Sequence, residues 1–151
     1  MPHRRSARLA SWQIHLLIWS TLLLWFTGMV WLGLHYFGQT EGEFGPELSP
    51  LEPWMLRAHG LFMVFMLVGL GSLLVAHIPL GWRDRGQRPA AIALTSLFLF
   101  LIITGYALYY VGTVELRDLT SLLHWIAGIP VPLIFWWHYR RRYSAQHAKR
   151  S

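Results

Sequence analysis

Histidine is the residue type that could do chemistry in this chain, and two histidines bound the stretch "HWIAGIPVPLIFWWH", from His124 to His138. The residues between them are almost all apolar, so this segment suits a lipid bilayer better than water. A polar side chain in such a segment costs free energy unless a partner or a ligand satisfies it. The two imidazoles therefore need an explanation, which depends on the other histidines.

Most of the eight histidines lie within or at the ends of long apolar segments. These are His15, His35, His59, His77, His124 and His138. Any one of them, taken alone, is equally well explained as an interfacial histidine bonded to a nearby carbonyl group. An imidazole is also a common metal ligand, so the arrangement of the histidines has to decide between the two explanations.

The depth of each histidine in its segment gives that arrangement. His124 and His138 are fourteen residues apart, which is about 21 Å along a continuous helix and about 40° short of four turns. Both imidazoles would then leave the same face. His59 in the second apolar segment matches the depth of His124, and His15 in the first matches that of His138 to within about 3 Å. The spacing thus places four histidines in two pairs at two depths.

Two facing imidazoles are the axial ligands that the iron of a b-type haem requires. No carboxylate or cysteine accompanies either pair, which argues against zinc. The chain contains no cysteine, which excludes iron–sulfur clusters and the thioether attachment of c-type haem. The pattern predicts two b haems stacked across a bilayer as a path for electrons.

His77 competes with His15 for the second of these sites. It lies eighteen residues after His59, so the two share a helix face but are about 27 Å apart. That separation is about 6 Å longer than the 21 Å between His124 and His138, whereas the depth of His15 differs from that of His138 by only about 3 Å. The depth argument favours His15 and leaves His77 open as a ligand.

Other residues have weaker reasons to be functional. Arg57, Arg117 and Arg140 are candidates to pair with haem propionates through charge-assisted hydrogen bonds. The third apolar segment contains no histidine, so we expect it to be a packing wall. If quinol is oxidised at the external surface, the nearest proton acceptors are His35 with Glu41, Glu43 or Glu52, although a structural role as solvated loop charges explains these residues more simply.

Four apolar segments supply the elements that would position these side chains: 12–36, 54–80, 89–111 and 119–138. Each is long enough to cross a bilayer as a helix, and only 13% of the residues are charged. The first apolar run is too long for a cleaved signal peptide, so we expect it to be retained. The sequence predicts a single all-α domain over residues 1–151, an integral membrane four-helix bundle with an irregular external loop at 37–53 and no internal repeat.

The charges predict how this bundle is oriented. Eleven of the thirteen basic residues lie in the two tails and in the loop between the second and third segments. Basic residues collect on the cytoplasmic side of membrane proteins, so both termini should be cytoplasmic. The net charge of +6 then reflects topology and attraction to anionic membrane lipid rather than nucleic-acid binding. We expect a multi-pass protein of the bacterial inner membrane.

Three stretches resemble the cytochrome b561 family, which includes small four-helix bacterial cytochromes b and the cytochrome b subunits of hydrogenases and dehydrogenases. They are "HLLIWSTLLLWFTG", which begins at His15 and ends in a Thr-Gly pair, "LRAHGLFM" around His59, and "LLHWIAGIPVPLIFWWHYRRR" around the last two histidines. The resemblance covers about residues 12–140.

This resemblance implies a pair of haem b groups, one ligated by His15 with His138 on the cytoplasmic side and one by His59 with His124 on the external side. It also implies electron transfer between quinone or quinol and a partner redox protein, and it is compatible with an oligomer and with quinol oxidoreductase activity. Pro130 and Pro132 depart from a regular last helix and are expected to kink it. The alternative hypothesis is a haem-free membrane anchor or assembly subunit whose histidines are interfacial.

Overall fold

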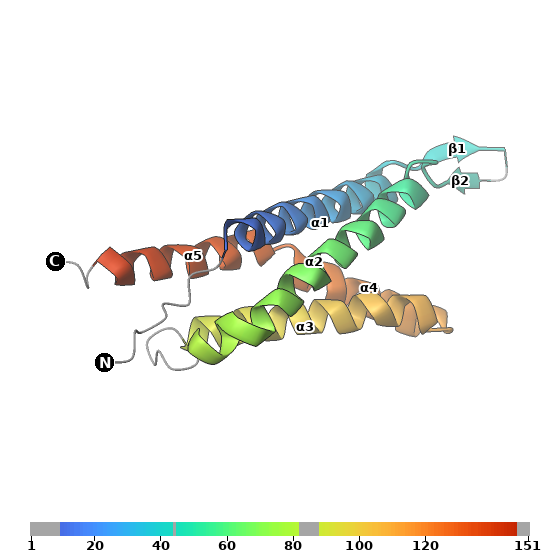
Figure 1. Cartoon of the computed structure of the whole chain (residues 1–151). Coiled ribbons are helices and arrows are strands. Elements are labelled where there is room, and N and C mark those ends of the chain that lie inside the picture. The colour runs from blue at the N-terminus through green and yellow to red at the C-terminus, as the bar shows by residue number, and fades with distance from the viewer. Residues whose placement is uncertain (1–9, 44, 82–87, 148–151) are drawn as a thin grey trace, which may run out of the picture. The chain divides into compact units, whose positions relative to one another are not determined.

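The computed structural model describes residues 10–43, 45–81 and 88–147, and nearly all of them are helical (Figure 1). The helices are α1 (Ser11–Phe37), α2 (Glu52–Gly81), α3 (Arg88–Tyr110), α4 (Val114–Gly128) and α5 (Val131–His147). Two short strands, β1 (Thr40–Gly42) and β2 (Gly45–Glu47), lie between α1 and α2. The expected all-α class is confirmed.

The chain divides into two compact units, with the division between Ile78 and Pro79 in the last turns of α2. Unit 1 contains α1, the two strands and α2, and unit 2 contains α3, α4 and α5. Each unit is described by itself below. The expectation that the helices form a single four-helix bundle stays a prediction.

Four segments among the described residues are long and apolar enough to cross a membrane. They are Ser11–Phe37, Glu52–Leu74, Ala91–Tyr110 and Val114–His138. Large apolar side chains on these helices are exposed, among them Trp19, Phe26 and Ile103. Lipid can cover such side chains at no hydrophobic cost, whereas water cannot. The protein is therefore a multi-pass membrane protein by the length and composition of its helices.

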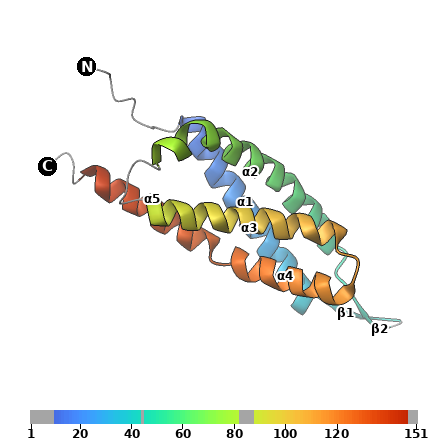
Figure 2. The ribbon, with the colours of Figure 1, turned by 90° about the horizontal axis from the view of Figure 1, so that it is seen from below.

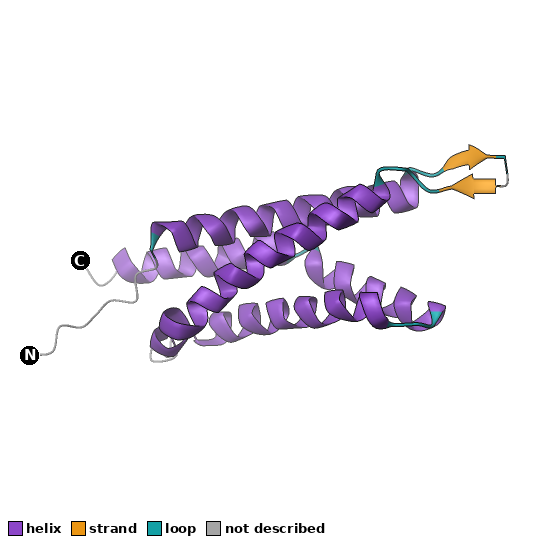
Figure 3. Ribbon diagram, turned by 45° about the vertical axis from the view of Figure 1, so that its right-hand side comes forward, coloured by secondary structure: helices purple, strands orange, loops and turns teal. Residues whose placement is uncertain are grey.

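The expected irregular loop at 37–53 is wrong for the middle of that segment. Strands β1 and β2 pair antiparallel there, with Thr40 opposite Glu47 and Gly42 opposite Gly45 (Figure 3). Gly45 has a φ of 117°, a backbone conformation that glycine adopts readily because it lacks a Cβ atom. The Gly and Pro content that indicated a loop instead supports a tight hairpin.

In unit 1 the helices α1 and α2 run antiparallel. The Gln13 side chain donates to Ser72 Oγ at 3.1 Å near one end of the pair, and Ser20 Oγ donates to Met66 Sδ at 3.7 Å further along. Close packing between these contacts requires a small residue, because a Cβ atom on Gly69 would lie 2.9 Å from Cδ2 of the buried Leu17. This is the usual way in which membrane helices approach one another.

In unit 2 the helix α3 packs along α4 and α5 (Figure 2). The apolar segment at 119–138 is interrupted at residues 129–130, next to the two prolines that were expected to kink it. Pro130 and Pro132 have no backbone N–H, so two hydrogen bonds of the helix cannot form. Ile129 keeps right-handed helical angles, so the break is local. The argument that His124 and His138 share one face assumed a continuous helix and does not hold across this break.

Replacing Gly69 by Ala should destabilise unit 1 by about 1–3 kcal/mol, because the new methyl group overpacks against Leu17. Gly71→Ala on the same helix is the matched control, since nothing lies within 4 Å of a Cβ atom built there. The thermal unfolding temperature in detergent should fall for the first variant and stay unchanged or rise for the second. Equal unfolding temperatures would show that α1 and α2 do not pack closely at this glycine.

Candidate functional site: a repeated contact between threonine and histidine

Unit 1 contains a polar contact between its two helices near the middle of α1. Thr27 Oγ1 lies 3.1 Å from His59 Nδ1. The Thr27 side chain belongs to the buried part of the unit, with only 4% of the residue exposed, and the His59 residue is half-buried. A hydroxyl group on α1 therefore fixes an imidazole on α2.

Unit 2 contains the same contact on different helices. Thr104 Oγ1 on α3 lies 2.9 Å from His124 Nδ1 on α4. Thr104 is 8% exposed, and His124 is half-buried. In both units the threonine belongs to the earlier helix and the histidine to the next helix along the chain.

A glycine follows the threonine in both units and lets the imidazole approach the helix. A Cβ atom on Gly28 would lie 3.3 Å from His59 Cε1, and one on Gly105 would lie 3.2 Å from His124 Cε1. These separations are tighter than ordinary van der Waals contact, so a larger side chain would push the ring away. We call each group of threonine, glycine and histidine a Thr–Gly–His site: Thr27, Gly28 and His59 in unit 1, and Thr104, Gly105 and His124 in unit 2.

The threonine hydroxyl groups determine where the protons lie in these sites. Each hydroxyl has a single proton. Thr27 Oγ1 lies 2.7 Å from the carbonyl oxygen of Leu23, and Thr104 Oγ1 lies 2.8 Å from that of Phe100. A carbonyl oxygen can only accept, so the hydroxyl proton is donated to the helix backbone, as buried helical threonines commonly do.

The imidazole must then be the donor in its contact with threonine. With its proton given to the backbone, the threonine oxygen can only accept, and Nδ1 of His59 or His124 donates to it. A neutral imidazole protonated on Nδ1 carries its lone pair on Nε2. Histidines that bind metals are usually arranged this way, with one ring nitrogen donating to the protein and the other directed to the metal. Both Thr–Gly–His sites therefore fit ligation of a haem iron through Nε2.

The sequence contained a signal for the second site that our sequence analysis missed. Thr27-Gly28 and Thr104-Gly105 are the two Thr-Gly dipeptides of the chain, and each is followed by a histidine on the next helix. The third apolar segment was expected to be only a packing wall because it lacks histidine. Instead, the hydroxyl group of Thr104 in this segment lies beside His124 and positions it. The two Thr-Gly dipeptides are a short local similarity that the expectation of no internal repeat did not include.

The remaining predicted haem ligands lie as follows. His15 is exposed on α1, and His138 is half-buried on α5. The side chain of His77 lies outside the described residues. Both predicted pairs, His15 with His138 and His59 with His124, join a residue of unit 1 to a residue of unit 2, so the pairing stays a prediction.

The three predicted propionate partners lie on three helices. The guanidinium carbon of Arg57 is 4.8 Å from the centre of the Trp54 ring, and that of Arg140 is 4.6 Å from the centre of the Trp136 ring. Arg117 is exposed on α4. Stacking on tryptophan orients an arginine and still leaves N–H groups for a carboxylate, so a role in binding propionates stays a prediction.

Within the described ranges, no three histidine, cysteine or acidic side chains gather as a metal site. A haem iron takes at most two protein ligands, so this result does not bear on haem. Comparisons of the chain with protein-family models, curated proteins and solved structures find no match. The case for any cofactor thus depends on the geometry of the Thr–Gly–His sites and on the resemblance of the motifs.

Nuclear magnetic resonance of ¹⁵N-labelled histidine should show His59 and His124 protonated on Nδ1. In Thr27→Val, His59 loses the threonine oxygen beside Nδ1, so its Nδ1 proton should exchange with water a few-fold faster or more, while that of His124 should not change. Thr120→Val is the matched control, because the Thr120 hydroxyl likewise donates to a backbone carbonyl, that of Leu116. Protonation of these rings on Nε2 in the wild type would contradict the proton assignment.

Proposed function

We propose that this protein is a membrane-bound di-haem b-type cytochrome that transfers electrons between quinone or quinol and a partner redox protein. The observation that carries the proposal is the occurrence of the same Thr–Gly–His site in both units, each with a threonine hydroxyl group within hydrogen-bond distance of Nδ1 of the imidazole. An interfacial histidine does not require such a partner, since water can satisfy it. Two equivalent imidazoles, one in each unit, support a role in ligation.

The residues of the chain would share the work as follows. His59 and His124 ligate one haem, and His138 ligates the other together with His15 or His77. Thr27 and Thr104 hold two of these rings in one orientation and one tautomer, which keeps Nε2 unprotonated for ligation. The apolar helices around them exclude water, which raises the effective strength of nearby charges. When bound, haem supplies one-electron chemistry.

The location of the protein follows from its charges. With both termini in the cytoplasm, the hairpin between α1 and α2 faces the external side of a bacterial inner membrane. The external haem would then lie near His59 and His124, and the cytoplasmic haem near His138. Membrane lipid, quinone and another redox protein or complex are the proposed partners, and the exposed apolar faces leave room for an oligomer.

The first test is the haem content of the purified protein. Two haem b groups per chain are expected from haem-replete cells, with low-spin spectra because both axial positions are filled. His59→Ala and His124→Ala should each remove or convert the same haem and leave the other unchanged. A well-folded preparation with no haem would contradict the proposal and favour a haem-free membrane anchor or assembly subunit.

A second test identifies the other ligand of the cytoplasmic haem. His138→Ala should affect only that haem, because His124 lies on a separate helix beyond the proline break. His15→Ala should reproduce this loss, whereas His77→Ala should leave two low-spin haems and at most shift a midpoint potential. Loss of the haem in His77→Ala, with retention in His15→Ala, would assign His77 as the ligand and reject His15.

A further inference from the structure

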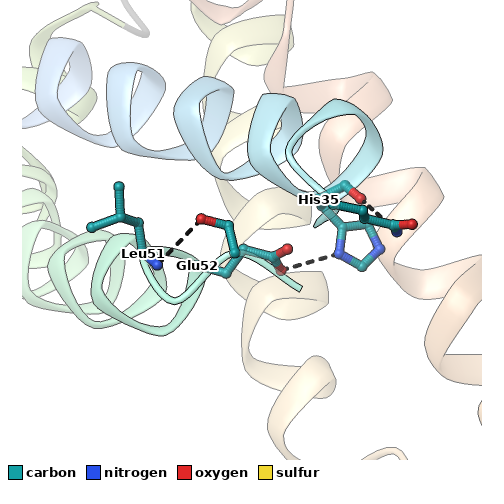
Figure 4. A network of polar contacts seen from close by, with 5 residues as sticks. His35, Leu51 and Glu52 are labelled. Carbon is teal, nitrogen blue, oxygen red and sulfur yellow. Dashed lines mark hydrogen bonds and ion pairs between the residues drawn. The ribbon is translucent and has the colours of Figure 1, made fainter. Parts of the chain in front are cut away.

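A buried carboxylate lies where α1 ends and α2 begins. Glu52 is the first residue of α2, and only 5% of it is exposed. Its Oε2 atom lies 3.1 Å from His35 Nδ1 in the last turn of α1 (Figure 4). The His35 side chain is 36% exposed, so the imidazole connects the buried carboxylate to the surface.

Two buried polar atoms, one in this pair and one beside it, have no hydrogen-bond partner among the described residues. Glu52 Oε1 is buried without a hydrogen-bond partner among the described residues, and so is the indole nitrogen of Trp31. The Trp31 ring stacks on the His35 ring, with centroids 4.8 Å apart and planes 18° apart. One unpaired acceptor and one unpaired donor thus belong to the same cluster of side chains. Leaving such groups buried and unpaired is costly, so a ligand that pairs with them would bind favourably.

The surroundings indicate what kind of ligand this would be. The pair lies at the ends of two helices that can cross a membrane, so a lipid-soluble molecule is the class of ligand found next to it, and side chains around Glu52 have to move for that molecule to meet Oε1. Trp31 and Tyr36 present ring surfaces beside the imidazole, with the Tyr36 ring edge-on at 5.1 Å. Flat aromatic molecules pack well on such surfaces. The unpaired carboxylate oxygen calls for a hydroxyl donor, and a hydroquinone has both a flat ring and hydroxyl groups.

We propose that His35, Glu52 and Trp31 form a binding site for a membrane hydroquinone, in which Glu52 accepts the hydroxyl proton. This inference rests on the proposed function, because it takes quinol as the electron source. The hydroxyl group donates to Glu52 Oε1, its O–H bond breaks, and the proton moves to the carboxylate to leave a hydroquinone anion. A neutral His35 with its proton on Nε2 accepts a proton from the Glu52 carboxyl group at Nδ1 and releases the Nε2 proton to the exposed side. The anion is the form that a one-electron acceptor oxidises more readily.

The competing explanation is that the pair only holds the ends of α1 and α2 together at the base of the hairpin. Binding of an alkyl hydroxyquinoline N-oxide, a hydroquinone mimic, separates the two roles. Glu52→Gln should weaken its binding by about tenfold or more, as expected for loss of a charged acceptor. Glu47→Gln, which changes an exposed carboxylate in β2, should bind the mimic as the wild type does. Wild-type affinity in Glu52→Gln, with or without a lower unfolding temperature, would overturn the proposal.

A second variant covers the case in which Glu52→Gln does not fold. Trp31→Phe keeps an aromatic ring on His35 but removes the indole N–H, and it should weaken binding of the mimic by a few-fold. Unchanged affinity in this variant would overturn the proposed site, because Trp31 is one of its three members.

Haem reduction provides a readout that tests proton transfer itself. In haem-containing Glu52→Gln, reduction by a short-chain hydroquinone should slow by about tenfold or more, whereas reduction by dithionite should match the wild type. Equal hydroquinone rates would overturn the role of Glu52. Because binding of the mimic is measured independently of haem, a haem-free protein that binds it would reject the proposed function alone. A di-haem protein that does not bind the mimic would reject this site alone.

Discussion

The single proton of a helical threonine is the constraint on which both Thr–Gly–His sites depend. In each unit a carbonyl oxygen one turn earlier in the same helix takes that proton. The threonine oxygen is then an acceptor, and the neighbouring imidazole has to donate through Nδ1. Because α1 and α3 are ordinary helices at this point, the backbone itself sets the tautomer of a histidine on another helix. The glycine next to each threonine completes the arrangement by admitting the ring to hydrogen-bond distance.

The sequence was a good guide to the helices and a poorer guide to what lies between them. The apolar segments at 12–36 and 89–111 match α1 and α3 to within one residue at each end, because a bilayer demands a long run without charges. The same signal could not detect the break at 129–130, which depends on two missing backbone donors rather than on polarity. It also could not detect the hairpin, because a two-stranded turn and an irregular loop use the same Gly and Pro residues.

The candidate site was only partly predictable for a related reason. Histidines were found by their chemistry, and the structure adds a threonine hydroxyl group beside His59 and His124, while their role as haem ligands stays a prediction. Thr104 was missed because a hydroxyl group has no charge and a membrane helix tolerates it without a ligand. Its role appears only when packing brings α3 against α4. The pairing of histidines between the two units depends on tertiary packing, which depth along a segment constrains but does not determine.

His59 and His124 differ from His35 in the group that lies next to Nδ1. This difference suits the first two to binding a metal and the third to proton transfer. Nδ1 of His59 and of His124 lies within hydrogen-bond distance of a neutral hydroxyl group, which orients the ring without adding charge. His35 instead meets the carboxylate of Glu52, a group that can bind and release a proton. A membrane protein that moves electrons from a hydroquinone has to send protons by a different route. Threonine partners for the imidazoles proposed to ligate haem, and a glutamate partner for His35 at the helix ends, would let histidine serve both requirements.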